Sequence, residues 1–281
     1  MPTVLSVQSR VAYGHVGNAA AVFPLQRLGI EAWALDTVAF SNHTGHGRWR
    51  GTAVPAAEVA ALFDGIAALG VLPSIDAVLS GYLGDAATGL LLLDIVGRVR
   101  AANPRALFCC DPVIGDVDTG SYVTDGIAEF FRDRALAAAD IATPNRFELE
   151  FLAGQPVANL AGAVEAAARL RAQGPGIVLV TSLEPESPDL LSMLACDAAS
   201  AWLVETPRLP VMLNGCGDVT AALFLAHLLR GASLKDALGL TAAAMFAVLD
   251  TTARLGRDEL ALVAAQDELV APSRRFPVLR L

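Results

Sequence analysis

Short apolar runs alternate with longer helix-like segments along most of this 281-residue chain. Thr3–Gln8, Glu31–Thr37 and Ile75–Ser80 are typical strand-like runs, and a helix-like segment follows each of them. Parallel strands need crossover connections, usually helices, so this alternation predicts a mostly parallel sheet with helices on both faces. No linker, low-complexity tract or internal repeat breaks the pattern. We therefore predict one domain, residues 1–281, with a three-layer α/β/α fold.

The bounds of the predicted elements follow from apolar periodicity and from turn residues. Asp85 is a suitable N-cap for a helix over Ala86–Ala102, which Asn103-Pro104 should stop. The other predicted strands are Ala106–Cys110, Asp140–Ala142, Ile177–Thr181, Leu191–Ala195 and Ala201–Val204. The other predicted helices are Val16–Leu28, Pro55–Leu69, Ile127–Phe131, Ala161–Gln173, Val219–Leu229, Leu234–Thr252 and Glu259–Leu269.

The charge balance excludes several classes of function. The chain has 20 basic and 29 acidic residues and a formal net charge of −9, whereas a nucleic-acid-binding domain usually carries a basic stripe. The longest stretch without Asp, Glu, Lys or Arg is Val11–Gln26, and it contains His15, Asn18 and Pro24. It does not predict a membrane span, which needs about 20 mostly apolar residues. We therefore expect a protein that binds neither nucleic acid nor a membrane.

The cysteines and the start of the chain indicate the compartment. Cys109, Cys110, Cys196 and Cys216 are scattered without a CxxC pattern, so neither a disulfide framework nor a zinc site is indicated. Met1 leads almost directly into a strand-like run, without the basic start or cleavage site of a targeting peptide. These features predict a cytoplasmic location with reduced thiols.

The sharpest motif is Asn214-Gly215-Cys216-Gly217-Asp218, directly before the predicted helix Val219–Leu229. Its two glycines allow a tight turn, and backbone N–H groups exposed at a helix N-terminus form an anion site suited to phosphate oxygens. Asp218 has two interpretations at this position. A carboxylate there often serves as a helix N-cap. It can also act as a general base that takes a proton from an attacking hydroxyl group.

Further polar side chains follow other predicted strands, where open α/β sheets bind their ligands. Asp111-Pro112-Val113-Ile114-Gly115-Asp116 follows one strand, Thr143-Pro144-Asn145-Arg146-Phe147-Glu148 follows the next, and Thr181-Ser182 ends a third. Acids and hydroxyl groups should therefore meet at one edge of the sheet. Asp111 and Glu148 suit Mg²⁺ bound with a nucleotide, although each alone would pass as an ordinary loop acid.

Two histidines lie three residues apart in Phe40-Ser41-Asn42-His43-Thr44-Gly45-His46-Gly47. A metal pair is the less favoured interpretation, because no third ligand has suitable local spacing; His43 and His46 are expected to line a pocket or face solvent. Gly14 and Gly17 do not form a GxGxxG fingerprint, and neither a GxxxxGK[ST] loop nor a GxSxG elbow occurs. Dinucleotide-binding, P-loop and α/β-hydrolase functions are therefore not predicted.

Together these motifs resemble the pyridoxal kinases of the ribokinase-like superfamily, over almost the whole chain. Gly215-Cys216-Gly217-Asp218 resembles the superfamily's anion hole and base, and Asn145-Arg146-Phe147-Glu148 resembles its NxxE magnesium motif. Asp111–Asp116 and Thr143-Pro144-Asn145 are similar to the nucleotide side of pyridoxal kinases. More specific are four segments similar to their vitamin site, Val7-Gln8-Ser9, Tyr13-Gly14-His15-Val16-Gly17-Asn18, Phe40-Ser41-Asn42-His43-Thr44-Gly45 and Ser80-Gly81-Tyr82-Leu83-Gly84.

The resemblance implies a ribokinase-like fold and ATP-dependent phosphorylation of the primary 5′-hydroxyl of pyridoxal, and of pyridoxine or pyridoxamine, in vitamin B6 salvage. It implies that Asp218 is the catalytic base and that the anion hole comprises Gly215, Cys216 and Gly217. The residues implied at the vitamin are Ser9, Thr44, Gly45, Tyr82 and Asp218. Those implied at ATP are Asp111, Thr143, Glu148, Thr181 and Ser182, with Asp111 and Glu148 also at Mg²⁺. The family further implies a monovalent cation such as K⁺ and a homodimer.

The sequence departs from the family pattern near the anion hole. The segment Pro207–Leu213, which should lie over ATP, is short for this family. Asn214 and Cys216 stand where apolar and small or β-branched residues are expected. A thiol pKa tends to fall at a helix N-terminus. A passive role is still favoured for Cys216, because a nucleophilic thiol would need an identifiable His base nearby.

Two other functions stay open. A kinase of the same fold could act on another small alcohol, such as a hydroxymethylpyrimidine or a sugar, although the segment Ser41–Gly45 argues against a sugar. The second alternative is a non-catalytic carrier of pyridoxal phosphate. Asp111, Glu148 and Asp218 argue against it, because a carrier needs neither a base nor magnesium ligands.

Overall fold

A computed structural model describes residues 1–184 and 187–281 of the chain. Ten strands of these residues form one sheet, and two more form a separate hairpin. The strands are β1 (Thr3–Val11), β2 (Glu31–Phe40), β3 (Gly51–Ala53), β4 (Ala77–Ser80), β5 (Leu107–Cys110), β6 (Gly115–Asp116), β7 (Gly120–Ser121), β8 (Ile141–Ala142), β9 (Ile177–Leu183), β10 (Leu190–Cys196), β11 (Ala201–Pro207) and β12 (Val278–Arg280).

The order in the large sheet is β12-β11-β10-β9-β8-β5-β4-β1-β2-β3. The central strands from β9 to β2 all pair in parallel. Antiparallel strands extend the sheet at both edges, with β3 beside β2 and with β10, β11 and β12 beyond β9. The mostly parallel sheet predicted from the sequence is therefore confirmed.

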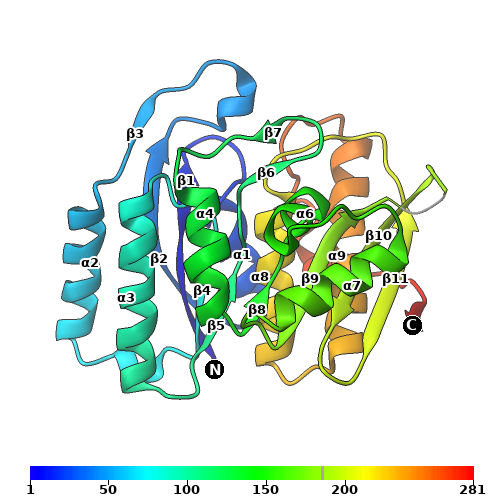
Figure 1. Ribbon diagram of the computed structural model, residues 1–281. Helices are drawn as coiled ribbons and strands as arrows, with labels where there is room; N and C mark the ends of the chain where they lie inside the picture. Colours follow the sequence, from blue (N-terminus) through cyan, green and yellow to red (C-terminus); the bar gives the residue numbers. More distant parts are fainter. Residues whose placement is uncertain (185–186) are drawn as a thin grey trace.

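Helices cover both faces of the sheet (Figure 1), and each layer encloses its own apolar cluster. This arrangement confirms the three-layer α/β/α prediction. One layer contains α2 (Ala56–Ala68), α3 (Ala86–Ala102), α4 (Ile127–Phe130), α5 (Leu136–Ala138), α6 (Arg146–Ala153) and α7 (Leu160–Arg171). The other contains α1 (Asn18–Arg27), α8 (Cys216–Leu229), α9 (Leu234–Arg254) and α10 (Gln266–Val270). Short 3₁₀ turns occupy Thr44–His46 and Leu72–Ser74.

Helix α9 is long and apolar enough to cross a membrane, the one such helix within the described ranges. It packs instead against α8 and against strands β10 and β11. Leu238, Ala242 and Val248 are fully or almost fully buried there. A core helix of this kind is apolar because of its position in the fold.

Local signals explain where the predicted helices agree with the structure and where they do not. Helix α3 has the predicted bounds, and Asp85 caps it by accepting a hydrogen bond of 2.7 Å from the N–H of Thr88. The prediction missed α6, which follows the strand-end motif directly. The predicted helix from Ile127 to Phe131 continues as a wider π turn over Phe131–Ala135 and then as α5.

The predicted helix Glu259–Leu269 is wrong for its first half. Only α10 is helical, and Glu259 lies in an irregular segment. In that segment the N–H of Ala261 donates to the hydroxyl of Thr252 on α9, at 2.9 Å, and the Glu259 carboxylate contacts residues near the start of the chain. These tertiary contacts outweigh the local helical pattern.

The sheet topology determines where a ligand can bind. The chain passes from β1 to β2 on one side and then returns to β4 on the other side of β1. Open α/β sheets bind ligands beyond the carboxyl ends of the strands at such a reversal. Val7 of β1 pairs with Ser80 of β4. Ser9 lies two residues further along β1, and Tyr82 lies two residues beyond the end of β4, so both flank this point.

Candidate functional site

Asp218 lies in the first turn of α8. This helix begins at Cys216, earlier than predicted, and its N-cap is Gly215. Asp218 is therefore the third residue of the helix, and its interpretation as the N-cap is wrong. Its Oδ2 accepts a hydrogen bond of 2.9 Å from the N–H of Gly17. Burial raises the pKa of Asp218 to about 6, against the lowering effect of this hydrogen bond.

The turn before α8 has no space for a side chain. Gly215 has a φ of 85°, in the left-handed region that favours glycine, and a Cβ there would collide with the carbonyl oxygen of His15. The first N–H groups of an α-helix have no partner within the helix and attract anions. The backbone of Gly215, Cys216 and Gly217 thus presents donors beside the Asp218 carboxylate.

Asp111 and Thr143 follow two neighbouring parallel strands. Cys110 of β5 pairs with Ala142 of β8, so the next residues on both strands meet, and the Thr143 hydroxyl donates to Asp111 Oδ1 at 2.7 Å. Asp111 is buried, and its burial and the charge of Asp218 raise its pKa to about 7. A Cβ at Gly217 would stand 3.9 Å from Asp111 Oδ2. This acid therefore lies directly beside the turn of α8.

Glu148 is buried at the first turn of α6, and both of its carboxylate oxygens have partners. Oε2 accepts from the N–H of Asn145 and Oε1 from the N–H of Ile114, each at 2.9 Å. Asn145 in turn caps the N–H of Glu148, which completes a capping box. Burial and the Asp111 charge hold the Glu148 pKa well above its usual range, while these hydrogen bonds lower it. The NxxE spacing is thus also the local signal that would have predicted α6.

Thr181 and Ser182 form a bulge in β9. Both lie opposite the single residue Met193 of β10, where the pairing register shifts. Ser182 has a φ of 55° and is the only non-glycine residue with positive φ in residues 1–184 and 187–281. The N–H of Thr181 donates to the carbonyl of Pro144 at 2.9 Å. Bulges redirect side chains near functional sites, and this one turns the end of β9 toward the loop that carries Thr143.

Ser9 and Tyr82 stand at the reversal point of the sheet. Ser9 is buried, and a Cβ at Gly17 would collide with its carbonyl oxygen. Ser9 is therefore in contact with the residue whose N–H holds Asp218. Tyr82 is half-buried, its burial raises its pKa, and its carbonyl accepts a hydrogen bond of 2.6 Å from the Thr37 hydroxyl.

Thr44 and Gly45 belong to an exposed connection between β2 and β3, residues 41–50, which we name the flap. They form a 3₁₀ turn in which Nδ1 of His43 accepts a hydrogen bond of 3.0 Å from the N–H of Gly45. A Cβ at Gly45 would stand 3.2 Å from Nδ2 of Asn214. The flap therefore reaches the loop that precedes α8, although both of its predicted site residues are exposed.

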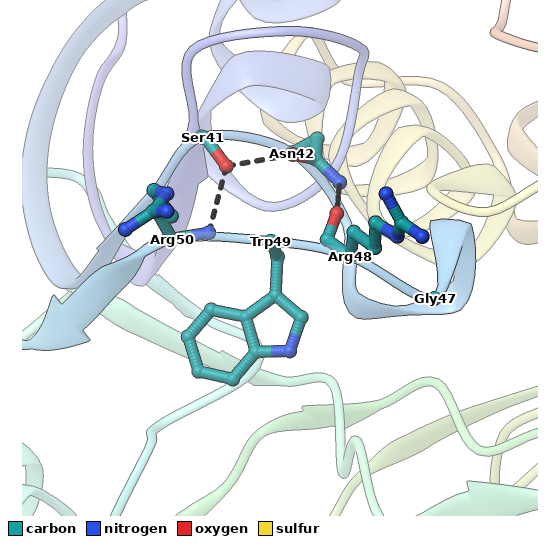
Figure 2. A pocket seen from close by; sticks show the side chains of 6 residues that line it. All are labelled: Ser41, Asn42, Gly47, Arg48, Trp49 and Arg50. Carbon is teal, nitrogen blue, oxygen red and sulfur yellow. Dashed lines mark hydrogen bonds between the residues drawn. The ribbon is translucent and has the colours of Figure 1, made fainter.

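The flap also has a hollow of its own (Figure 2), an open recess of about 570 Å³. The Ser41 hydroxyl accepts from the N–H of Arg50 at 2.9 Å, and Nδ2 of Asn42 donates to the carbonyl of Arg48 at 2.8 Å. These bonds hold the two arms of the flap together. The recess is separate from Asp218 and Asp111. Its lining residues are Ser41, Asn42, Gly47, Arg48, Trp49 and Arg50.

The surroundings of Cys216 do not favour a reactive thiol. Burial raises the pKa of the Cys216 thiol to about 12, the opposite of the fall expected at a helix N-terminus, and the thiol donates to the carbonyl of Leu213 at 3.3 Å. The part of the chain that the structure describes contains no group of three or more His, Cys, Asp or Glu side chains that could hold a metal ion.

Two residues that contribute to this site, Gly17 and Glu259, were not predicted from the sequence. Gly17, which donates to Asp218, lies in a segment that resembles the vitamin site but was not predicted as a site residue. Glu259 bonds His46 and the N–H of His15 but lies in the segment predicted as helix. No local pattern indicates the Glu259 contacts, because their partners are more than 200 residues away in sequence.

Comparisons with known proteins agree with the geometry. A family profile described as phosphomethylpyrimidine kinase matches residues 36–261. The chain is 58% identical to pyridoxal kinase PdxY of Rubrobacter xylanophilus over 281 residues, 99% of this chain and 97% of that protein. It is 52% identical to that of Granulibacter bethesdensis over 280 residues, 97% and 98% of the two chains.

Solved structures show the same fold. The pyridoxal kinase from Leishmania donovani in complex with ADP and pyridoxamine is 31% identical, with a TM-score of 0.94 and 100% coverage of both chains. The same enzyme in complex with ADP and ginkgotoxin is 32% identical, with the same TM-score and coverage. The ribokinase-like prediction is thereby confirmed. The chain therefore belongs to the pyridoxal kinase family.

Proposed function

We propose that this chain transfers the terminal phosphoryl group of ATP to the primary 5′-hydroxyl of pyridoxal, giving pyridoxal 5′-phosphate in vitamin B6 salvage, and that pyridoxine and pyridoxamine are accepted too. The observation that carries the proposal is the position of Asp218. Its carboxylate lies between the α8 turn with Asp111 beside it and the loop that contacts Ser9. A base at this place has an anion site on one side and a small-molecule site on the other.

Asp218 acts as the general base. A pKa of about 6 leaves it mostly ionised at neutral pH and still able to accept a proton. The Gly17 N–H anchors Oδ2, so Oδ1 remains available for the substrate hydroxyl. Asp218 removes the hydroxyl proton as the new oxygen–phosphorus bond forms. The protein's main contribution to such a transfer is positioning and charge stabilisation.

The turn formed by Gly215, Cys216 and Gly217 stabilises the phosphoryl group during transfer. Its N–H groups point out of the start of α8, where the helix dipole also favours negative charge. Asp111, Thr143, Thr181 and Ser182 bind on the nucleotide side, where ATP is the co-substrate. Their support is their common position at the carboxyl ends of β5, β8 and β9.

Asp111 and Glu148 fit Mg²⁺ bound together with a nucleotide. Within the described ranges neither forms an ion pair with a cationic side chain, and the negative charge of Asp111 raises the pKa of Glu148. Asp111 has the better access to the α8 turn. Glu148, with both oxygens already hydrogen-bonded, shapes the loop around the ion or reaches it through water. When bound, Mg²⁺ neutralises phosphate charge. A monovalent cation such as K⁺ is proposed from the family resemblance alone.

Ser9, Thr44, Gly45 and Tyr82 form the vitamin side. Hydroxyl and backbone groups there suit the polar edges of a small aromatic ring. The support for Ser9 and Tyr82 is their place at the reversal of strand order, and that for Gly45 is its approach to Asn214. We also propose that the chain functions as one domain, in a cytoplasmic homodimer. Light scattering of the purified protein tests the dimer.

A coupled assay of ADP release over a panel of vitamers, a hydroxymethylpyrimidine and sugars tests the function. The pyrimidine is the main alternative substrate, because the matching family profile is described as phosphomethylpyrimidine kinase. We expect ADP release with pyridoxal, dependent on a divalent cation. Preferred turnover of the pyrimidine would contradict the proposed substrate. Binding of pyridoxal phosphate without any turnover would instead identify a carrier.

A further inference from the structure

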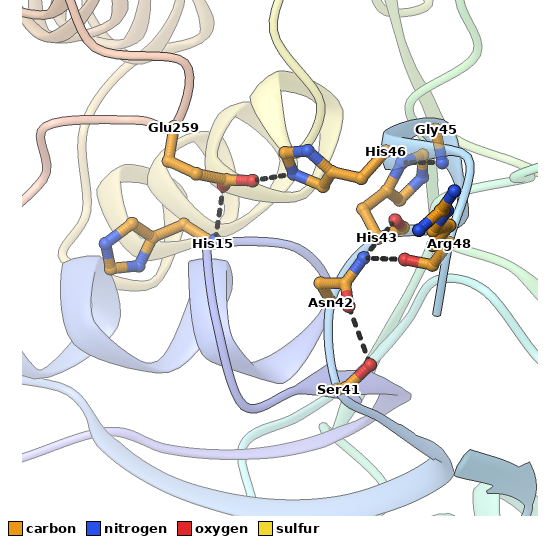
Figure 3. A network of polar contacts seen from close by, with 8 residues as sticks. All are labelled: His15, Ser41, Asn42, His43, Gly45, His46, Arg48 and Glu259. Atoms are coloured by element: carbon orange, nitrogen blue, oxygen red, sulfur yellow. Dashed lines mark hydrogen bonds and ion pairs between the residues drawn. The ribbon is translucent and has the colours of Figure 1, made fainter. Parts of the chain in front are cut away.

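Glu259 connects two segments from the start of the chain (Figure 3). Its Oε1 bonds Nε2 of His46 at 2.7 Å, and its Oε2 accepts from the N–H of His15 at 3.0 Å. The Glu259 side chain is only 13% exposed. Its carboxylate stands so close to Gly14, which has a φ of 92°, that a side chain at Gly14 would collide with it. The contact is therefore specific in position and largely shielded from solvent.

One of the two contacts holds the flap. His46 is the last residue of the 3₁₀ turn that also contains Thr44 and Gly45. Its ring also packs edge-on against Tyr13, with 6.0 Å between ring centroids. The flap residues 44–50 are otherwise exposed. Apart from bonds within the flap and the approach of Gly45 to Asn214, the contacts of His46 with Glu259 and Tyr13 hold the position of this turn.

The other contact holds the loop that carries His15 and Gly17. The carbonyl of His15 packs against Gly215 at the α8 turn, and the N–H of Gly17 bonds Asp218. The two oxygens of Glu259 therefore act on two different parts of the site. One fixes the turn on the vitamin side, and the other fixes the loop that orients the base.

We propose that Glu259 is a positioning residue, which couples the position of the flap turn Thr44–His46 to the loop that orients Asp218. The inference rests on the proposed function. Glu259 contacts no part of the reacting groups in this arrangement; it acts through His46 and His15. Its role is to bring the substrate-binding turn and the base into register, so that the vitamin is held where the base can reach its hydroxyl group.

The test compares Glu259→Gln with Glu259→Ala. Glutamine still accepts from the N–H of His15, but its amide NH₂ then faces Nε2 of His46 in place of a carboxylate oxygen, whereas alanine loses both contacts. We expect Gln to raise the KM for pyridoxal about 3- to 10-fold with little change in the KM for ATP. We expect Ala in addition to lower kcat, because the base loop is then released. His46→Gln should match Glu259→Gln, and the double variant should be no worse than either.

Limited trypsin digestion measures the flap directly, without substrate. Arg48 and Arg50 are exposed cleavage sites in the flap. Their cleavage should be about 5-fold faster or more in Glu259→Gln. The matched control is Asp267→Asn, which breaks the exposed Arg27–Asp267 ion pair in the same C-terminal part and should change none of these values.

Three results would overturn the proposal in different ways. If the Gln variant has a lower melting temperature but unchanged flap cleavage and pyridoxal KM, Glu259 is only a structural tether. If the wild-type chain phosphorylates no vitamer, the proposed function fails and the role of Glu259 fails with it. An active wild type with unmoved variants overturns the role of Glu259 alone. If the Ala variant does not fold, the Gln variant and its control still decide.

Discussion

The two sides of the site are built by different means. On the proposed nucleotide side, Asp111 and Thr143 follow directly from paired strands and bond each other, and Glu148 is buried in a capping box. On the proposed vitamin side, the flap is exposed and is held by contacts with Asn214 and with the distant Glu259. One side is therefore positioned by the sheet itself, and the other by a few long-range contacts.

This difference has energetic consequences. The charge of Asp218 raises the pKa of Asp111, and the charge of Asp111 raises that of Glu148. Charge on these buried carboxylates therefore lowers the stability of the fold, and a bound cation would relieve this cost. An exposed connection with few contacts opens locally at low free energy, which suits entry of a substrate. We expect substitutions on the nucleotide side to affect chemistry and metal dependence, and those on the flap to affect vitamin binding.

The largest effect is expected at Asp218, where the two sides meet. Asp218→Asn should lower kcat about 10²–10⁴-fold, the usual size of a lost general base, while both substrates still bind. Asparagine can still accept from the Gly17 N–H, so the loop should stay in place. Turnover, binding of each substrate and melting temperature are the measurements. Turnover near that of the wild type would remove Asp218 from the mechanism.

The direction in which the melting temperature of Asp218→Asn should change can also be predicted. The pKa of Asp218 in the folded chain, about 6, lies above its ordinary value of 3.8. The folded state therefore binds more protons than the unfolded state between these values, and stability falls as the pH rises through that range. At pH 8 the Asn variant avoids the buried charge. Its melting temperature should equal or exceed that of the wild type.

The second largest effect is expected at Glu148. Glu148→Gln should raise the Mg²⁺ concentration needed for half-maximal activity about 10–100-fold, the range seen for residues that orient metal ligands. The KM for pyridoxal should change much less. An amide NH₂ facing a backbone N–H also leaves a buried donor unpaired, so stability should fall by about 1–3 kcal/mol. Magnesium titrations and thermal melts separate the two effects.

Glu150→Gln on the same helix is the control for Glu148. Glu150 also accepts a backbone hydrogen bond, from Val157 at 2.9 Å, but it is not among the residues that meet at the α8 turn. Glu150→Gln should lower the stability of the fold but leave the Mg²⁺ concentration for half-maximal activity unchanged. An unchanged magnesium titration in Glu148→Gln would contradict a metal role for this residue.

The sequence predicted the geometry at the ends of β5 and β8 better than the contacts of the flap, for a physical reason. Strand ends and the α8 motif are local patterns, so the contact between Asp111 and Thr143 followed from adjacent parallel strands. The helix α6 was missed although its capping box is equally local. Glu259 could not be predicted, because a carboxylate that bonds partners over 200 residues away has no periodic signature.

The value of kcat/KM should fall toward acidic pH, because Asp218 then becomes protonated and can no longer act as a base. Asp218 must be ionised to accept a proton, and burial raises its pKa to about 6. In the enzyme before pyridoxal binds, kcat/KM should therefore fall about tenfold between pH 7 and pH 5. The measurement is kcat/KM for pyridoxal at saturating ATP, with a stability check at each pH. The residual kcat/KM of Asp218→Asn should not fall between pH 7 and pH 5. If it does fall, a group other than Asp218 causes the pH dependence.

Ser9 and Thr44 test the vitamin side. Ser9→Ala and Thr44→Val should each weaken pyridoxal binding by about 0.5–1.5 kcal/mol, the value of a neutral hydrogen bond. Ser9 is buried and Thr44 exposed, so we expect the larger loss for Ser9. Calorimetric titration with pyridoxal and with ATP separately measures both. Weaker ATP binding with unchanged pyridoxal binding would reverse our assignment of the two sides.

The control for these variants is Ser74→Ala. Ser74 lies in the 3₁₀ turn before β4, at the opposite end of that strand from Tyr82. Its hydroxyl donates to the carbonyl of Val71 at 2.7 Å, so the substitution also removes one hydrogen bond. It should leave the binding of both ligands unchanged.

The smallest effect is expected at Cys216, although this residue lies at the proposed anion hole. Its contribution there is a backbone N–H, which any side chain retains. With its pKa raised to about 12, the thiol is protonated at neutral pH and is a weak nucleophile. Cys216→Ala should change kcat by about twofold or less, within the range of substitutions that lose no essential contact. Iodoacetamide at pH 8 should leave the wild-type activity largely intact. A turnover loss of the size expected for Asp218→Asn would show that the thiol takes part in the chemistry, and the anion hole would then need its side chain as well as its backbone.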